Sequence, residues 1–162
     1  FERKNMIKSM CPCQSGQRYS DCCAPYHQHT AQAESADVLM RSRYSAYTLC
    51  HIGYIVETTV PVQQALLDQH AMQNWAEETN WQGLEILRHQ PFITPKHSLV
   101  HFKALFQTET GIEAHEEHSL FVLIENRWYF VDPTVPLPNQ KQPCICGSGK
   151  KFKHCCGAWL VR

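Results

Sequence analysis

The sequence CPCQSGQRYSDCCA, residues 11–24, returns near the other end of the chain as CICGSGKKFKHCCG, residues 144–157. Both segments have the pattern Cys-x-Cys, eight residues, Cys-Cys, with a Ser-Gly pair and an aromatic residue at matching offsets. Eight of the nine cysteines therefore form two equivalent quartets. This pattern predicts two metal sites, because a structural zinc ion is enclosed by four protein ligands, with Zn–S bonds of about 2.3 Å.

Zinc is the metal that the two quartets favour. Thiolates are soft ligands, which select zinc, copper(I) or iron–sulfur clusters over magnesium or calcium. Disulfides fit less well, because a bridge between adjacent cysteines has poor geometry and an odd cysteine count is unusual in a bridged protein. Disulfides and an iron–sulfur or redox role remain the alternatives. The ninth cysteine, Cys50, follows an apolar helical segment and is predicted to be a small core residue. The predicted zinc ligands are Cys11, Cys13, Cys22, Cys23, Cys144, Cys146, Cys155 and Cys156.

The two quartets differ in the charges around them. The N-terminal copy has only Arg18, which Asp21 opposes, whereas the C-terminal copy is cationic through Lys150, Lys151, Lys153 and His154. Nearby cations favour the thiolate form that binds metals, so we expect the C-terminal site to bind zinc more tightly. The formal net charge is zero. Two loaded four-thiolate sites would lower it to about −4.

Length and composition describe an ordinary folded protein. The 162 residues are 43% hydrophobic and 19% charged, which allows one domain with a real core. No apolar run approaches the roughly 20 residues that span a bilayer. The first ten residues, FERKNMIKSM, lack the apolar segment of a signal peptide. Abundant metal-type cysteines then favour the cytoplasm, and a zero net charge without a long basic stripe argues against sequence-specific nucleic-acid binding.

The ten histidines are scattered and form no HExxH motif. His115 and His118 flank Glu116 and Glu117. On a strand these side chains alternate between faces, so we predict a solvated surface there.

The central segment contains helices followed by strands. Helical spacing predicts helices over residues 33–50, 54–57 and 62–78, with Ser35 as the first N-cap. Alternation predicts antiparallel strands over residues 81–89, 97–108 and 128–132. Thr110-Gly111 is the predicted turn into a further strand, whose core is residues 120–124. This order is typical of an α+β fold. We divide the chain into an N-terminal motif (1–26), a central domain (27–133), a Pro-rich linker (134–143) and a C-terminal motif (144–162).

A curved sheet packed against helices can enclose a conical pocket. The alternative is that the aromatic and histidine side chains simply pack in the hydrophobic core and line no pocket. Arg43 shares an apolar helix stripe with Met40 and Tyr47, which predicts either a structural ion pair or an anion-binding group. The candidate pocket residues are Arg43, Tyr44, Tyr47, Trp75, His101 and Trp128.

Both cysteine segments resemble the SEC-C motif, the zinc-binding element at the C-terminus of the SecA translocation ATPase. The C-terminal copy matches it well, whereas the N-terminal copy departs from it at Gln14 and at Gln17-Arg18. In SecA the module docks to the export chaperone SecB and to the ribosome. The resemblance therefore implies a protein partner of this kind, contacted through Lys150, Lys151, Phe152 and Lys153.

The whole chain resembles the YchJ-like family of bacterial proteins. The resemblance rests on LMRSRYSAYTLCHIGYIVETT (residues 39–59), on WYFVDP (residues 128–133) and on the two terminal motifs. It implies a central domain similar to nuclear transport factor 2, a cone of helices against a bent sheet, flanked by two small zinc-binding motifs. The family name brings a fold and a metal but no activity.

Three functions follow from these observations. The first is a zinc-stabilised protein-interaction module. The second is a small-ligand binder, or an isomerase- or dehydratase-type enzyme, that uses the cone pocket; catalysis is disfavoured because such chemistry needs an Asp or His base in the cone, and the sequence offers only His101. The third is a thiol redox sensor, although closed four-cysteine sites are usually structural. The sequence assigns no catalytic residue and no oligomeric state.

Overall fold

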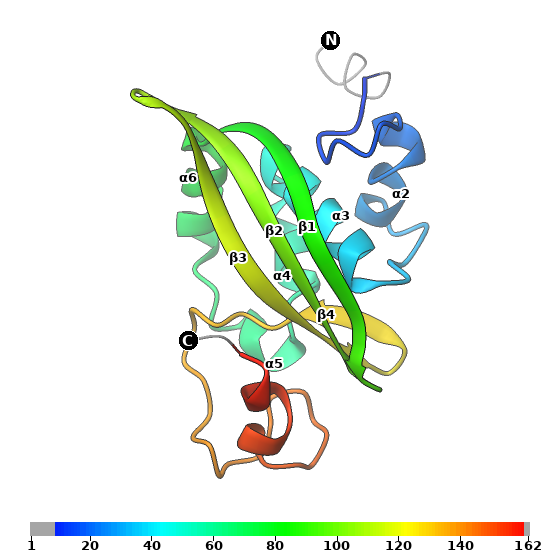
Figure 1. Cartoon of the computed structure of the whole chain (residues 1–162), viewed down its shortest axis with the longest axis vertical. Coiled ribbons are helices and arrows are strands. Elements are labelled where there is room, and N and C mark those ends of the chain that lie inside the picture. Colours follow the sequence, from blue (N-terminus) through cyan, green and yellow to red (C-terminus); the bar gives the residue numbers. More distant parts are fainter. Residues whose placement is uncertain (1–8, 161–162) are drawn as a thin grey trace.

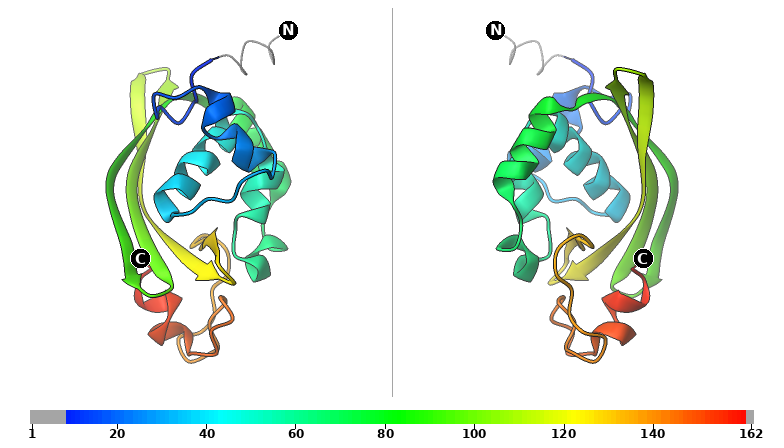
Figure 2. Two further views of the ribbon diagram at one scale, coloured as in Figure 1. Left: turned by 90° about the vertical axis from the view of Figure 1, so that its right-hand side faces the viewer. Right: turned by 90° about the vertical axis from the view of Figure 1, so that its left-hand side faces the viewer.

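The structure is a computed structural model that describes residues 9–160. It contains one curved antiparallel sheet with helices on its concave side (Figures 1 and 2). The strands follow one another in the order β1-β2-β3-β4. They are β1 (Asn80–Thr94), β2 (His97–Thr108), β3 (Gly111–Ile124) and β4 (Arg127–Phe130). The predicted α+β class and helix-then-strand order are confirmed.

The helices precede the sheet in the sequence, and three short 3-10 turns belong to the cysteine motifs and their surroundings. The helices are α2 (Ala24–His27), α3 (Ala36–Thr48), α4 (Ile52–Glu57), α5 (Pro61–Gln64) and α6 (Gln69–Glu78). The 3-10 turns are η1 (Tyr19–Asp21), η2 (Phe152–His154) and η3 (Cys156–Ala158). No helix in this described part of the chain is long and apolar enough to cross a membrane.

Helix α3 is the centre of the helical layer. It packs on β1, β2 and β4 and buries both apolar and polar side chains, including Leu39, Ser42 and Arg43. Ser35 stands at the N-cap position, but its hydroxyl donates to the Asp37 carboxylate instead of capping the backbone. Cys50 is not the predicted core residue. It lies beyond the helix with φ of 60° and is half-buried, because the chain turns there towards α4.

The helix predicted over residues 62–78 is two helices in the structure. Pro61 begins α5, which ends at Gln64. Asp68 then starts α6 as a new helix, because its carboxylate accepts a hydrogen bond from the Ala71 amide at 3.0 Å. The intervening segment leaves Leu66 50% exposed.

Strand β1 is longer than alternation predicted, because it runs on to Thr94. Strand β3 begins at Gly111, at the predicted turn. The first part of β3 is polar, so it lacks a strand-like hydrophobic pattern, yet it pairs with β2 residue by residue. Glu125 and Asn126 have φ of 48° and 64°, the positive values that a tight two-residue hairpin turn requires.

Each cysteine quartet is part of a hydrophobic core. The N-terminal quartet packs with α3, α4 and the sheet in one cluster. The C-terminal quartet packs with Val60, Leu120, Val122 and Val131 in a second cluster. The two motifs lie at opposite ends of the sheet (Figure 2). Residues 134–143 have no helix or strand but pack onto the C-terminal motif, where Gln142 O accepts from the Phe152 amide.

Candidate metal centres and central cavity

The four cysteines of the N-terminal motif converge on one point. The Cys11 amide donates to Gln17 O at 2.8 Å, which closes the first turn of the motif. Gly16 has φ of 87°, a left-handed conformation that glycine adopts without a steric penalty. The return path through η1 then delivers the second pair. The Sγ atoms of Cys13 and Cys22 are 3.6 Å apart, and those of Cys22 and Cys23 are 3.8 Å apart.

The C-terminal motif repeats this local structure. The Cys144 amide donates to Lys150 O at 2.9 Å, and Gly149 has φ of 82°. Ser148 donates to Cys155 Sγ at 3.3 Å, as Ser15 contacts Cys22 Sγ at 3.1 Å in the first copy. The repeated sequence thus folds twice into the same metal-binding loop.

Both quartets fit a tetrahedral metal ion. In each group the four Sγ atoms lie within 4.8 Å of one another. A tetrahedron with metal–sulfur bonds of about 2.3 Å has edges of about 3.8 Å, close to the separation of Cys22 and Cys23 Sγ. A disulfide would need sulfurs about 2.05 Å apart, and all nine cysteines are free. The two predicted four-cysteine groups are confirmed as groups that can hold metal ions, and the disulfide alternative is not supported.

The thiol electrostatics are alike in the two motifs. Hydrogen bonding from Cys11 lowers the pKa of Cys13, and hydrogen bonding from Cys144 lowers the pKa of Cys146. In both copies, therefore, the second cysteine of Cys-x-Cys is the thiol that most readily becomes the thiolate a metal binds.

The central domain supports the two quartets with different side chains. Ser45 of α3 donates to Cys23 Sγ at 3.3 Å and contacts Cys11 Sγ at 3.4 Å. His97 of β2 is 3% exposed and places Nε2 at 3.3 Å from Cys156 Sγ, while its Nδ1 pairs with Thr94 Oγ1 at 2.6 Å. Burial lowers the pKa of His97. In the tautomer that donates Nε2–H towards the sulfur, Nδ1 accepts from the Thr94 hydroxyl. Such partners orient metal ligands.

The residues proposed to contact a partner separate into two groups. Lys150 and Lys151 are exposed and Lys153 is half-buried, on the surface of the C-terminal motif. Phe152 is 0% exposed and packs so closely under the loop that a Cβ at Gly157 would lie 2.7 Å from its ring. The assignment of Phe152 as a contact residue is therefore corrected: it is the core residue of the motif, as Tyr19 is in the first copy.

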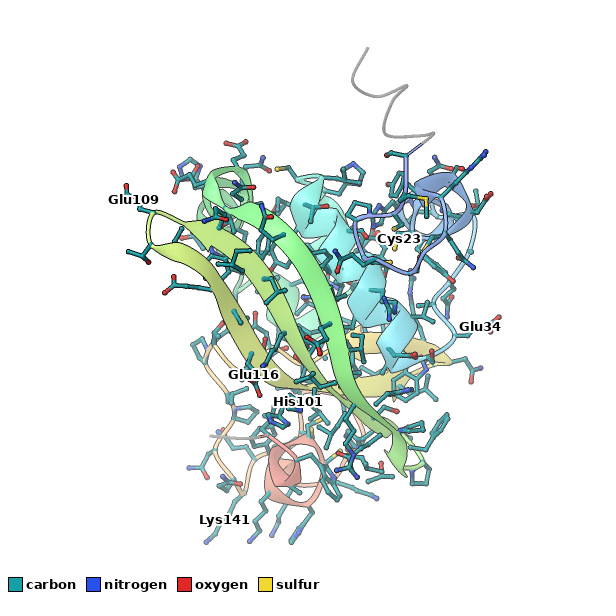
Figure 3. All side chains as sticks on the ribbon, turned by 45° about the horizontal axis from the view of Figure 1, so that its top comes forward. Cys23, Glu34, His101, Glu109, Glu116 and Lys141 are labelled. Atoms are coloured by element: carbon teal, nitrogen blue, oxygen red, sulfur yellow. The ribbon has the colours of Figure 1, made fainter. Side chains whose placement is uncertain are left out.

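A cavity of about 300 Å³ lies between α3, α6 and the concave face of the sheet. Four of the predicted pocket residues line it: Arg43, Tyr44, Tyr47 and Trp75. His101 and Trp128 do not. His101 lies on the outer face of β2, because it alternates with Phe102, which faces inward (Figure 3). Trp128 is buried against Phe92.

Several polar residues of the cavity were not predicted. His115, Glu117 and Ser119 of β3 line it, with Asp132 after β4. Strand alternation could have indicated these residues, because Glu117 pairs with Phe102 and Ser119 with Val100, two inward-facing residues. They were not predicted because the polar segment was interpreted as wholly solvated. The cone therefore contains titratable side chains, His115, Glu117 and Asp132, that we did not expect from the sequence.

A third group of possible ligands lies on the outer face of the sheet. His101 Nε2 contacts Glu116 Oε2 at 2.6 Å, and the His101 and His118 rings stack with centroids 3.8 Å apart (Figure 3). Hydrogen bonding from His101 lowers the pKa of Glu116. Stacked imidazoles present their nitrogen lone pairs side by side rather than towards one ion, so this cluster is best described as a surface hydrogen bond between His101 and Glu116 with His118 stacked beside it.

The fold and the two motifs together define a class of protein: a nuclear transport factor 2-like domain flanked by two SEC-C motifs. The description "YchJ, middle NTF2-like domain" matches residues 35–133, and the SEC-C motif matches residues 9–25 and 141–158. The chain belongs to the YchJ family, whose similar members carry the designation UPF0225.

The similar proteins and solved structures cover three quarters or more of this chain. A UPF0225 protein from Actinobacillus succinogenes is 57% identical over 95% of this chain and 100% of its own length. One from Haemophilus influenzae is 60% identical over 98% and 99%. The crystal structure of a SEC-C motif containing protein from Psychrobacter arcticus is similar, with a TM-score of 0.92 and 47% identity over 96% of this chain and 99% of that one. A solution structure of a SEC-C motif containing protein from Rhodopseudomonas palustris has a TM-score of 0.69 and 38% identity over 75% and 94%.

Proposed function

We propose that this protein is a zinc-dependent protein-interaction module of the cytoplasm, which docks to an acidic surface of a partner through its C-terminal SEC-C motif. By resemblance to the SecA module, the partner class is a SecB-like chaperone or the ribosome. Zinc is the metal of this proposal because a closed set of four buried thiolates is the ligand set of structural zinc sites.

The observation that carries the proposal is the difference in charge between two modules of the same shape. Residues 141–158 contain four lysines and no acidic residue, whereas residues 9–25 contain Arg18 and Asp21. A four-thiolate zinc site adds a formal −2 to each, which leaves about +2 at the C-terminal module and about −2 at the N-terminal module. Only the C-terminal module is suited to an acidic partner.

The four lysines of residues 141–158 are available to a partner. Their side chains form no ion pair with any carboxylate of residues 9–160, where Lys103 is the one lysine that forms an ion pair. Lys150 and Lys151 are exposed, and Lys141 extends from the same end of the molecule (Figure 3). The cluster beneath them is fully buried, so zinc would hold the cationic loop in one conformation and reduce the entropy lost on docking.

The test compares charge reversal in the two modules at constant zinc content. Zinc-loaded wild-type protein, Lys150→Glu/Lys151→Glu, and the matched control Arg18→Glu would be measured against purified SecB and against ribosomes by equilibrium binding. We expect at least a tenfold loss for the lysine variant, a small effect of Arg18→Glu, and weaker wild-type binding at higher salt. Equal affinities for all three proteins, or no binding to either partner, would refute the proposal.

A further inference from the structure

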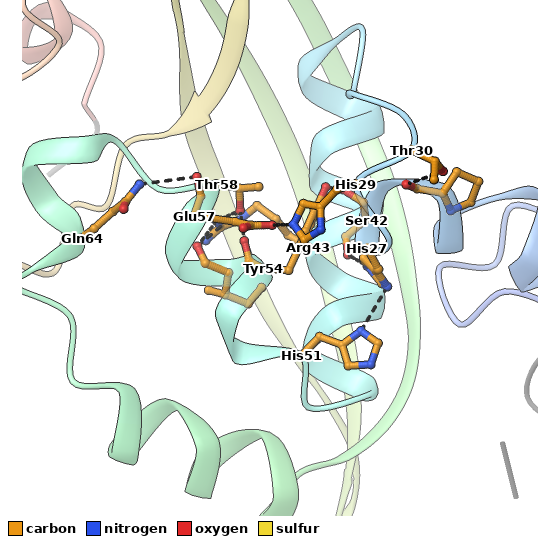
Figure 4. Close-up of polar contacts among 12 residues, drawn as sticks. His27, His29, Thr30, Ser42, Arg43, His51, Tyr54, Glu57, Thr58 and Gln64 are labelled. Atoms are coloured by element: carbon orange, nitrogen blue, oxygen red, sulfur yellow. Dashed lines mark hydrogen bonds and ion pairs between the residues drawn. The ribbon is translucent and has the colours of Figure 1, made fainter.

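The central cavity contains a buried cation that forms no ion pair with a carboxylate of the described residues. Arg43 is 5% exposed, and Figure 4 shows it reaching from α3 towards Thr58. Its Nη1 donates to Ile55 O at 3.0 Å and to Thr58 Oγ1 at 2.7 Å. Phe130 stacks against it, with Cζ 4.4 Å from the ring centroid. Within residues 9–160 no carboxylate lies within the 4.0 Å of an ion pair, so the predicted structural ion pair is absent there.

The other edge of this guanidinium is available to a ligand. All hydrogen bonds that Arg43 makes to described residues come from Nη1. A guanidinium is a planar fork whose paired N–H groups bind a carboxylate in a bidentate manner. Burying a cation without such a partner is costly, and burial does lower the pKa of Arg43. Because Arg43 lines the cavity, a bound anion would offset that cost.

One more polar atom beside this cavity lacks a partner. Ser119 Oγ is buried and makes no hydrogen bond in the described structure, and Ser119 lines the cavity. Ser119 stands two residues before Phe121 on β3, and Phe121 pairs with Phe130, the residue that stacks on Arg43. A hydroxyl can donate a hydrogen bond, and buried polar groups without partners are rare and call for an explanation. An acceptor-rich group between Arg43 and Ser119 supplies one.

The remaining walls indicate the rest of the ligand. Trp75 packs edge to face against Tyr47 and Trp81, and the rings of Tyr47 and Trp81 are tilted against each other. The ring centroids are 5.1 to 6.2 Å apart, and the three residues line one side of the cavity. Flat apolar groups stack on such surfaces. A volume of about 300 Å³ is at the lower end of ligand pockets, so the ligand is small. Glu117 and Asp132 also line the cavity and favour the charged form of Arg43, and they would repel a ligand that carries more than one negative charge.

We propose that this cavity binds a small organic monocarboxylate with a flat apolar body. The carboxylate pairs with Arg43 and accepts from Ser119 Oγ, while the apolar body packs against the aromatic wall of Tyr47 and Trp75. This site is separate from the docking surface and does not depend on the function proposed above. It assigns a ligand class and no reaction.

The test uses three probes of one shape that differ in charge: phenylacetate, phenylalanine and 2-phenylethanol. Binding to zinc-loaded full-length protein would be followed by calorimetry and by quenching of tryptophan fluorescence. We expect both carboxylates to bind at least tenfold more tightly than the neutral alcohol. Tighter binding of phenylalanine than of phenylacetate would add an ammonium contact to Glu117 or Asp132, and the reverse order would define a simple carboxylate site; either order supports the proposal.

Two kinds of variant identify the site. Arg43→Lys keeps the charge but loses the fork, and we expect at least a tenfold loss for the carboxylates, with exposed Arg88→Gln as the control. Because Arg43 also donates to Ile55 O and Thr58 Oγ1, a folding defect in Arg43→Lys would also weaken ligand binding. Ser119→Ala avoids this, since it removes a hydroxyl that has no partner in the described structure. This variant should keep its melting temperature and lose carboxylate affinity. Equal binding of carboxylate and alcohol, no binding of any probe at about 10 mM, or unchanged affinity of Ser119→Ala would overturn the proposal.

Discussion

Truncating Phe152 to alanine should remove the metal from the C-terminal motif and leave the N-terminal one loaded. The ring is 0% exposed and belongs to the cluster that contains all four C-terminal cysteines. Removing a fully buried phenylalanine side chain costs about 3–5 kcal/mol. In a motif whose folding is coupled to metal binding, that cost appears as lost metal affinity. At about 1.4 kcal/mol per decade, zinc binding should weaken by roughly two to four decades.

Native mass spectrometry during a chelator titration measures this effect directly. Wild-type protein should release both metals at high chelator concentration, whereas Phe152→Ala should release one much earlier. Thiol alkylation and peptide mapping then show which quartet has opened. Tyr19→Ala is the matched control, because Tyr19 stands at the equivalent position and should release the other metal. If Phe152→Ala keeps both metals to the wild-type chelator concentration, the ring does not stabilise the quartet and the packing argument is wrong.

Three further predictions follow from other contacts of the motifs. His97→Ala should weaken metal binding at the C-terminal site by about 10–100-fold, and Ser45→Ala should weaken it only at the N-terminal site. The same chelator titration measures both, and an effect of either variant at the opposite site would contradict this assignment. Peroxide should open the N-terminal quartet first, because Cys22 alone among the eight ligands is half-buried rather than buried, and alkylation mapping that finds the C-terminal quartet first would refute this. Burial lowers the pKa of His27 to about 4, so between about pH 6.5 and about pH 4 the unfolded chain binds a proton that the folded chain does not. As the pH falls through that range, the free energy of unfolding of the wild-type protein should decrease by at most about 3 kcal/mol more than that of His27→Gln. Equal pH dependence of the two proteins in denaturant unfolding would show the prediction to be wrong.

The sequence could predict whatever depends on regular spacing. Two quartets at identical offsets indicate two equivalent sites, and the alternation of Val100, Phe102 and Ala104 indicates the inner face of β2. These patterns repeat because a tetrahedral ion and a pleated strand both impose a fixed period.

What the sequence could not show depends on contacts between distant segments. His97 reaches the C-terminal quartet across 59 residues of sequence, and nothing near it in the chain distinguishes it from nine other histidines. Phe152 was misassigned because it stands among exposed lysines, and only the fold shows that its ring turns inward. Polar strand β3 was placed in solvent for a similar reason. Its outer face is solvated, but Glu117 on its inner face borders the cavity.

The contacts of the two quartets also bear on the order in which the chain is synthesised. The N-terminal quartet is complete once Cys23 has been added, long before Ser45 and β1 exist to pack against it. The C-terminal quartet closes only with Cys156, when His97, Val60 and Leu120 are already available to receive it. The first metal can therefore enter a nascent loop, whereas the second enters a prepared platform and completes the second core cluster. A chain interrupted before Cys156 can hold the first metal but cannot close the second site, so the number of bound metals reports whether translation has passed Cys156.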